Sequence, residues 1–480
     1  MIKKNKVLLI ILIGFLISII SSIYNIKNHD KNIISKDGTH YHKMIKYDVY
    51  RYLSHGHEIK NQITEGVNFF ETGREHYTKY LPARLIALYY YFFDLNLFED
   101  ENNKIINEGI HLNYLIIQCL FYFICVTILY ISLSNRFSNN ITFYTIAFLC
   151  LEPTINQYHS TFWSESIFFS LQILLIALIL KNNSSIYIFG AMGIFLAILS
   201  FQKEYSIFYI IFITIYFILI KEKRLIKKIS FMLIIFIMMQ SIIGFNNYFR
   251  SGKFYIMTAD SKVNIYNDMV THVMSKTLNL SHRKFIEMEG EVVHSWIKEN
   301  SIDYDKENLD YYVKVNNGDA PSWSDYRATL NEKNKAKFDN FIRNRTIDYM
   351  LEYPLEFLSR IIKNSFHIVL LNPLHIWSDH NFTSGEEYYF SETHDELVKY
   401  RIFYSSAMYL ICLIGLIHMI KKKDFNLLLF LTLSIIYFYS LVSWNGNTRY
   451  FVPAFVYASF FFGYGVDKII NFNKKRNEIE

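Results

Sequence analysis

Residues 186–220 read IYIFGAMGIFLAILSFQKEYSIFYIIFITIYFILI, in which the charged pair Lys203–Glu204 separates two long apolar runs. Each run approaches the length of about 20 apolar residues that a helix needs to cross the hydrocarbon core of a membrane. The stretch therefore predicts two membrane-spanning helices that are joined by a very short polar turn.

The rest of the chain repeats this pattern. Of the 480 residues, 52% are hydrophobic and only 19% are charged, and the apolar residues are gathered into about ten runs. A soluble enzyme, a nucleic-acid-binding protein and a secreted disulfide scaffold are thereby excluded, and we predict an α-helical polytopic membrane protein. The predicted spans are residues 7–24, 110–132, 141–155, 162–180, 186–202, 205–220, 229–245, 401–420, 425–443 and 450–467.

The first run could also be a signal peptide. No small-x-small cleavage site follows it, so a membrane anchor with its N-terminus in the cytoplasm is favoured. Lys and Arg then gather in alternate connections, as the positive-inside rule requires, with both termini in the cytoplasm. The basic positions on this predicted cytoplasmic side are Arg136, Lys181, residues 221–228, Lys421–Lys423 and Lys474–Arg476.

This topology places two large polar segments outside the membrane. The segment after residue 354 carries several charges and suits an interfacial or re-entrant helix rather than a complete crossing. We predict seven parts: a first transmembrane anchor (1–24), a first external loop with interfacial helices (25–108), a transmembrane bundle (109–245), a second external domain (246–354), an interfacial helix with an external loop (355–399), C-terminal transmembrane helices (400–467) and a cytoplasmic tail (468–480).

Several ionisable residues converge on the predicted outer face. Charged groups close to lipid are costly and mark functional sites, although simple interfacial anchoring or an ion pair, such as Lys203 with Glu152 or Glu165, is the alternative. A solute or lipid transporter would instead need charges near the bilayer midplane and helices broken by Gly or Pro. The converging residues are Asp37, Glu152, Glu165, Lys203, Glu204 and Arg449.

The sequence has no P-loop, no G-x-G-x-x-G fingerprint, and no Ser-His-Asp, CxxC or H-E-x-x-H arrangement. No ATP or nucleotide sugar is available to an enzyme outside the membrane. Group transfer there needs an activated donor that is delivered by the membrane itself, such as a polyprenyl-phosphate sugar.

Seven short segments, in order along the chain, resemble the polyprenyl-phosphate-sugar-dependent glycosyltransferases of the GT-C fold, in the branch of protein mannosyltransferases and aminoarabinose transferases. They are Asp37-Gly38 with Tyr41; Tyr80-Leu81-Pro82-Ala83-Arg84-Leu85 with Phe93-Asp94; Glu152-Pro153 with Tyr158-His159-Ser160 and Trp163-Ser164-Glu165; Leu196 to Glu204; Asn247-Tyr248 with Gly252-Lys253-Phe254 and Asn264-Ile265-Tyr266; Tyr353-Pro354-Leu355-Glu356-Phe357 with Arg360; and Arg449-Tyr450-Phe451-Val452-Pro453.

The resemblance implies that a sugar moves, with inversion, from a polyprenyl-phosphate donor to a hydroxyl of a surface glycan, lipid or protein. Asp37 matches the catalytic position and would be the general base that takes the acceptor proton. Glu165 would orient the sugar or hold the acceptor. Arg449, Lys203 and Arg84 would bind the donor phosphate and stabilise its growing charge, with Arg360 as a further contributor. The implied location is a bacterial inner membrane, with membrane lipids around the protein and the site facing the periplasm.

The chain departs from the family pattern at two places. Lys203-Glu204 stands where an Arg-Pro pair is usual, and Asp37-Gly38 stands where the family has two acidic residues, so Asp48 and Glu58 are candidates for a second carboxylate. An O-antigen polymerase or ligase is the alternative enzyme, although such proteins rely on Arg- and His-rich outer loops.

We expect no required cofactor and no metal ligand. The alternative is a divalent metal held by two His-x-His pairs, His40 with His42 and His55 with His57, together with Asp37 or Glu58. On a β-strand, residues i and i+2 share a face and can ligate one ion.

Overall fold

The computed structural model of the chain is nearly all helical. It describes residues 4–28, 33–34, 40–41, 48–68, 71–72, 80–96, 98–100, 105–106, 108–162, 164–181, 185–220, 225–251, 254, 256, 266–303, 326–327, 329–370, 392–445 and 451–477. The elements of the membrane bundle are α1 (Lys4–Asn28), α4 (Glu108–Ser134), α5 (Asn139–Leu151), α6 (Pro153–Asn156), the 3-10 turns η2 (Gln157–Ser160) and η3 (Glu204–Phe208), α7 (Glu165–Leu180), α8 (Ile186–Gln202), α9 (Tyr209–Leu219), α10 (Leu225–Ser251), α19 (Glu392–Lys422), α20 (Phe425–Asn445) and α21 (Pro453–Asn477).

A helix of this bundle covers most of each predicted span, as expected if an apolar segment in lipid satisfies its backbone hydrogen bonds internally. Two spans differ in detail: α5 ends at Leu151, four residues before the predicted end, and the span 205–220 is divided between η3 and α9. The helical membrane class is thereby confirmed. Within the described residues, four helices are long and apolar enough to cross a membrane, and five more apolar helices are shorter. The number of complete crossings therefore stays a prediction. The four long stretches are Asn5–Tyr24, Gly109–Ser134, Leu225–Phe249 and Ile402–Lys422.

Glycines bring three helices of the bundle into very close contact. A Cβ atom on Gly415 of α19 would overlap the Phe461 carbonyl oxygen of α21, and one on Gly465 would overlap the Ile411 carbonyl oxygen. On another face of α21, a Cβ atom on Gly463 would overlap the Thr145 hydroxyl of α5. Small residues are the usual means of helix association in membranes, where apolar burial alone gives no driving force.

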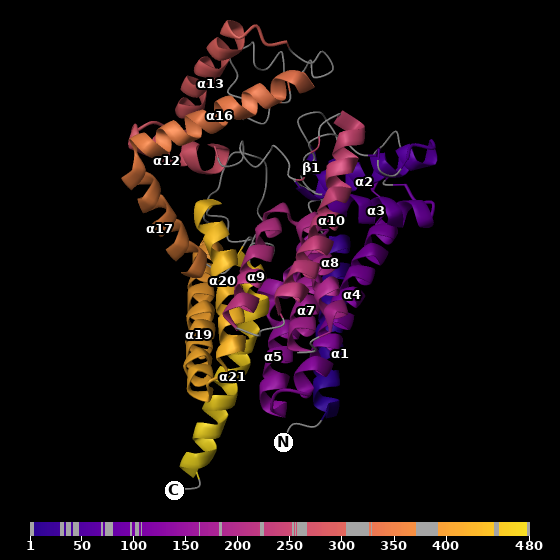
Figure 1. Ribbon diagram of the computed structural model, residues 1–480, viewed down its shortest axis with the longest axis vertical. Coiled ribbons are helices and arrows are strands. Elements are labelled where there is room, and N and C mark those ends of the chain that lie inside the picture. The colour runs from indigo at the N-terminus through magenta and orange to yellow at the C-terminus, as the bar shows by residue number, and fades with distance from the viewer. Residues whose placement is uncertain are drawn as a thin grey trace.

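A second hydrophobic core lies at the opposite end of the molecule from the two termini (Figure 1). Its largest buried side chains are Tyr266, Phe285 and Phe338, and it has no buried member in common with the core of the bundle. The elements that build it are η4 (a π-helical turn, Tyr266–Val270), α12 (Thr271–Thr277), α13 (His282–Glu299), α16 (Glu332–Glu352) and the start of α17 (Pro354–Leu370). We refer to this part, residues 266–303 and 326–352, as the outer domain.

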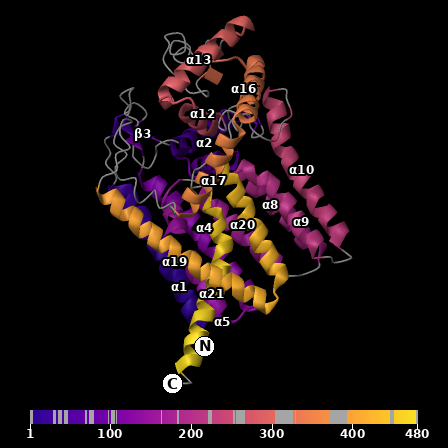
Figure 2. The same cartoon turned by 90° about the vertical axis from the view of Figure 1, so that its left-hand side faces the viewer.

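α17 connects the outer domain to the bundle, where it packs against α20. Phe357 is buried in the core of the outer domain, whereas Leu355 and Leu358 on the same helix are exposed. The helix is therefore amphipathic, and its predicted position at the membrane interface stays a prediction. In Figure 2, α10 stands beside α8 and α9, and it ends at Ser251, six residues beyond the predicted end of its span.

The segment after α1 contributes two helices and two small hairpins. Helices α2 (Asp48–Thr64) and α3 (Tyr80–Phe92) pack on each other, and α3 also contacts α8. The hairpins pair β1 (Ile33–Ile34) with β2 (His40–Tyr41), and β3 (Phe98–Asp100) with β4 (Ile105–Ile106), both antiparallel. α2 and α3 lie beside the end of the bundle that faces the outer domain (Figure 1).

Candidate active site

A buried ion pair joins two helices of the bundle near the outer domain. Lys203 Nζ lies 2.7 Å from Glu165 Oε1, and the two side chains are 4% and 2% exposed. The sequence predicted both residues as part of the site, one as a phosphate ligand and the other as a carboxylate that positions substrate. The structure joins them in the ion pair that the sequence also allowed as an alternative to substrate binding, so the charge of Lys203 is balanced by Glu165, and their roles towards a substrate stay predictions.

The local backbone places Glu165 and Lys203 at the same end of the bundle, because one is at the start of α7 and the other is at the end of α8. Glu165 is the first residue of α7, where the positive end of the helix dipole favours a carboxylate. Lys203 follows the last residue of α8 in an extended conformation (φ −143°, ψ 108°), which directs the chain out of the helix and into η3. Beside the pair, Gln202 Nε2 donates to the Ser164 carbonyl oxygen at 2.7 Å. Two adjacent bonds thus tie the end of α8 to the start of α7.

Two side chains next to the ion pair have polar atoms that make no hydrogen bond to the described residues. Among the described residues, the Ser164 hydroxyl and Gln202 Oε1 are buried and have no hydrogen-bond partner. Buried polar atoms in native proteins are nearly always satisfied, by protein, water or ligand. The hydroxyls of a sugar are donors and acceptors of the kind that would satisfy them.

Glu152 was predicted to converge on the same face, but its carboxylate has a structural role. Its oxygens accept bonds from the Thr154 hydroxyl (2.7 Å), the Ile155 N–H (2.9 Å) and the Tyr404 hydroxyl (3.1 Å). Proline at 153 keeps the preceding residue out of the helical region, so α5 ends at Leu151 and Glu152 caps the N-terminus of α6. The Glu152 carboxylate therefore serves as a helix cap, and Lys203 pairs with Glu165 instead.

Arg84 lies on α3 and is 6% exposed. Its Nη2 donates to the Thr72 carbonyl oxygen at 3.0 Å and to Asn246 Oδ1, near the end of α10, at 3.4 Å. Because α3 packs on α8, Arg84 belongs to the same end of the bundle as Lys203. Asn246 is a partner that sequence reasoning missed, since 162 positions separate it from Arg84.

Two of the predicted residues, Asp37 and Arg449, lie outside the described residues. Asp48 is the first residue of α2, and Glu58 is a half-buried residue of the same helix. His55 and His57 also belong to α2, so the expectation that they share one face of a strand is wrong for this pair. Among the described residues, no group of three or more His, Cys, Asp or Glu side chains is arranged to hold a metal ion.

His159, in the turn η2, is another buried titratable group near this end of the bundle. Its Nδ1 lies 2.7 Å from the Ser166 hydroxyl of α7, and its carbonyl oxygen accepts a bond from Gln118 of α4. Burial lowers the pKa of His159 to about 3, so the imidazole is neutral at ordinary pH. A neutral imidazole bonded to a hydroxyl fixes the turn between α5 and α7.

No family model matches the chain, and no curated protein sequence matches it. Two solved structures of an oligosaccharyltransferase from Archaeoglobus fulgidus match the chain. One, tethered to an acceptor peptide containing the NVT sequon, has a TM-score of 0.50 and 12% identity and covers 100% of this chain. The other, in complex with an inhibitory peptide and a dolichol-phosphate, has a TM-score of 0.49 and 12% identity and covers 99% of this chain.

The chain spans about half the length of that oligosaccharyltransferase, 51% and 52% in the two structures. At 12% identity the first likeness shows a shared fold along the whole of the present chain, and nothing finer than the fold. The predicted helical membrane fold is confirmed, and it is shared with that solved structure. Membership of the mannosyltransferase or aminoarabinose-transferase branch stays a prediction.

Proposed function

We propose that the chain is a membrane glycosyltransferase that moves a sugar from a polyprenyl-phosphate donor to a hydroxyl acceptor on the external face. The observation that carries the proposal is a buried ion pair, Lys203–Glu165, in a chain that shares its fold along its full length with an oligosaccharyltransferase. Removing two charges from water is costly, and ionisable residues in such a bundle are candidates for a functional site, which supports the proposal.

In the proposed reaction the acceptor oxygen attacks the anomeric carbon while the bond from that carbon to the phosphate oxygen breaks, with inversion. Asp37 accepts the acceptor proton, and the polyprenyl phosphate leaves with an added negative charge. Arg449, Lys203 and Arg84 balance that charge, and removing one such donor typically costs about 3 kcal/mol of transition-state stabilisation. The bond between Lys203 and Glu165 holds the ammonium in place before the substrate arrives.

Glu165 has a second part in the proposal, since it would share the sugar hydroxyls with the Ser164 hydroxyl and Gln202 Oε1. All three groups are buried, and they lie next to one another where the start of α7 meets the end of α8. A sugar bound there would place its hydroxyls against these atoms and its phosphate towards Lys203. The acceptor remains one of three classes: a surface glycan, a lipid or a protein.

The test uses the purified full chain in liposomes with a panel of radiolabelled polyprenyl-phosphate sugars and a membrane extract of the host. With the wild type, the radiolabelled sugar should move from polyprenyl phosphate onto a product that contains no polyprenyl group. With Asp37→Asn, it should remain on the donor. Equal transfer by both proteins would refute Asp37 as the base. Absence of transfer with every donor, in folded protein, would refute the reaction and favour an O-antigen polymerase or ligase, or a transporter.

A further inference from the structure

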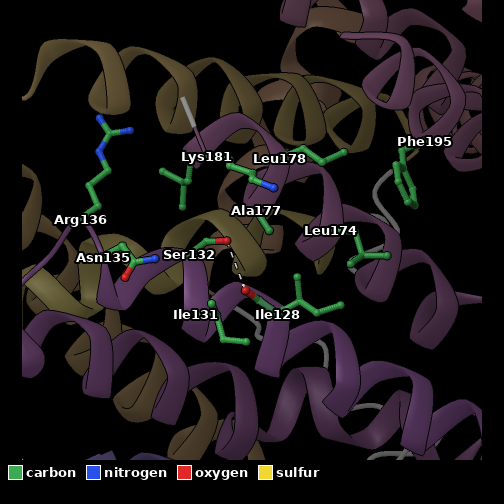
Figure 3. Close-up of a pocket in the computed structure, with 11 residues that line it drawn as sticks. Ile128, Ile131, Ser132, Asn135, Arg136, Leu174, Ala177, Leu178, Lys181 and Phe195 are labelled. Atoms are coloured by element: carbon green, nitrogen blue, oxygen red, sulfur yellow. Dashed lines mark hydrogen bonds between the residues drawn. The ribbon is translucent and has the colours of Figure 1, made fainter. Parts of the chain in front are cut away.

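A hollow of about 760 Å³ opens between α4, α7 and α8 at the far end of the bundle from the Lys203–Glu165 pair. It is lined by the last turns of α4, the C-terminal half of α7 and Phe195 of α8 (Figure 3). Pockets that hold small ligands have volumes of about 300–1,000 Å³, so this hollow has the size of a binding site. We call it the α4–α8 groove.

The α4–α8 groove has an apolar part and two cationic side chains. Ile128, Leu174 and Phe195 line the apolar part, while Arg136 follows α4 and Lys181 caps the C-terminus of α7. In Figure 3, Arg136 and Phe195 lie at opposite ends of the groove. Figure 3 shows the amine of Lys181 beside Ala177 and Leu178, between these two ends, so the groove offers two positive charges next to an apolar lining, as an amphiphile requires.

Both cationic groups are accessible to a ligand. Lys181 is exposed. Arg136 lies near Asp424, but Nη2 and Oδ1 are 3.7 Å apart, which is longer than a hydrogen bond, and the arginine side chain is 34% exposed. Asp424 balances one of the two charges in part, and the groove keeps a positive balance. By the positive-inside rule both groups lie on the predicted cytoplasmic side.

The groove also continues an apolar surface that lipid must cover. Ile117, Leu120 and Ile124 are exposed along one face of α4, a helix long and apolar enough to cross a membrane, and this face leads to Ile128 and Ile131 at the groove. An acyl chain that follows this face would enter the groove from the bilayer, with its headgroup at the level of the two cations.

We propose that the α4–α8 groove binds one anionic phospholipid of the cytoplasmic leaflet, with its phosphate between Arg136 and Lys181 and an acyl chain against Ile131 and Leu174. Basic pockets between transmembrane helices on the cytoplasmic side are suited to anionic headgroups. The site is separate from the proposed transfer reaction, because it lies at the other end of the bundle.

The experiment reconstitutes the full chain in nanodiscs with equal amounts of phosphatidylglycerol and phosphatidylcholine, and counts retained lipids by native mass spectrometry. Phosphatidylglycerol should be retained in preference, and each cation removed should lower its retention about five-fold. Arg136→Gln with Lys181→Gln should lower it at least ten-fold. Lys227→Gln, at the same end of the bundle on α10 and outside the groove, is the matched control and should retain it like the wild type.

A second variant, Ile131→Trp, fills the groove without changing charge at a position that is 56% exposed. It should also lose the retained phosphatidylglycerol, and it keeps the test decisive if the double variant does not fold. Equal retention of the two lipids by the wild type, or full retention by a folded variant of either kind, would overturn the proposal. So would the displacement of phosphatidylglycerol by an equal amount of polyprenyl phosphate.

Discussion

Substitutions at Lys203 and Glu165 can distinguish a contribution to stability from a contribution to the reaction. Lys203→Gln or Glu165→Gln alone leaves the other charge buried without its partner, which should destabilise the protein by about 3–5 kcal/mol. The double variant, with two neutral amides, should recover most of that loss. Thermal unfolding in detergent measures all three.

The same double variant tests the proposed function. It should fold and yet transfer no sugar, because neither the ammonium nor the carboxylate remains. A double variant that is as stable and as active as the wild type would show that the pair only holds α7 against α8.

His159 makes a prediction about pH. The folded state keeps its imidazole neutral because its pKa is lowered to about 3, whereas the unfolded chain takes up a proton below about pH 6.5. The unfolded state therefore binds more protons in this window, and stability should fall as the pH is lowered. Between pH 7 and pH 5 the loss from this group is about 2 kcal/mol.

The measurement is thermal unfolding of the wild type and His159→Asn at both pH values. The variant should lose less stability on acidification. Ser166→Ala is the matched control: it removes the hydrogen bond but leaves the imidazole buried, so its acid sensitivity should match that of the wild type. A His159→Asn protein that is equally sensitive would contradict the prediction.

The residues of the site were only partly predictable from the sequence. Lys203 and Glu165 could be found because charges beside apolar runs are conspicuous. Glu152 was conspicuous for the same reason. The Glu-Pro dipeptide predicts a helix cap at this position, and that signal was missed. The bond between Arg84 and Asn246 has no local signal, since it joins α3 to α10.

At the scale of elements, Glu289 of α13 joins three parts of the outer domain. Its carboxylate accepts bonds from Arg345 (Nε at 2.8 Å) and from the Tyr349 hydroxyl (2.6 Å), both on α16, and from the Tyr266 hydroxyl of η4. Burial, and then the bonds to Glu289, raise the pKa of both tyrosines, which stay protonated as donors. The three elements therefore share one buried acceptor.

Glu289→Gln should destabilise the outer domain by about 3 kcal/mol, because Arg345 loses its counter-charge. Trp296, stacked on Phe341 in the same core, reports the unfolding by fluorescence. Glu287→Gln is the control on the same helix, since its ion pair with Arg283 is exposed and should contribute less than about 0.5 kcal/mol. Equal effects of the two substitutions would contradict the role of Glu289.

The crossing of α19 and α21 makes a prediction about packing. Gly415→Ala places a Cβ atom against a backbone carbonyl that cannot rotate away, so the helices must separate at a cost of about 2 kcal/mol or more. Gly190→Ala is the control, because the nearest atoms there belong to the Phe231 ring, which can move. Thermal unfolding compares them, and an undisturbed Gly415→Ala protein would refute the tight crossing.

Helices were predictable from the sequence wherever apolar runs are long, but their ends were not. α10 continues to Ser251 and α19 begins at Glu392, so both helices include polar residues beyond the apolar run from which they were predicted. The core of the outer domain could not be predicted, since Tyr266, Glu289 and Arg345 are far apart in sequence and lie on three separate elements.

For the whole molecule, the two termini lie at one end and the outer domain at the other (Figure 1), which makes the predicted sidedness testable. A cysteine at Arg283, an exposed residue of α13, should react with an impermeant maleimide in intact cells. A cysteine at Lys423, between α19 and α20, should react only after permeabilisation. The four native cysteines are buried or half-buried, so the unmodified chain is the background control. Reversed labelling would refute the topology.

The shortness of α8, which ends next to Lys203, has a consequence for the surrounding bilayer. α8 exposes Tyr187 and Ile194 at the surface of the bundle, and its 17 residues give a length of about 25 Å, against a hydrocarbon core of about 30 Å. Such hydrophobic mismatch is relieved when lipids thin beside the protein. Local thinning of the bilayer would bring the headgroups of the predicted outer leaflet closer to the level of Lys203. The lipid-linked substrate of the proposed reaction would then approach the site through this thinner region of the membrane.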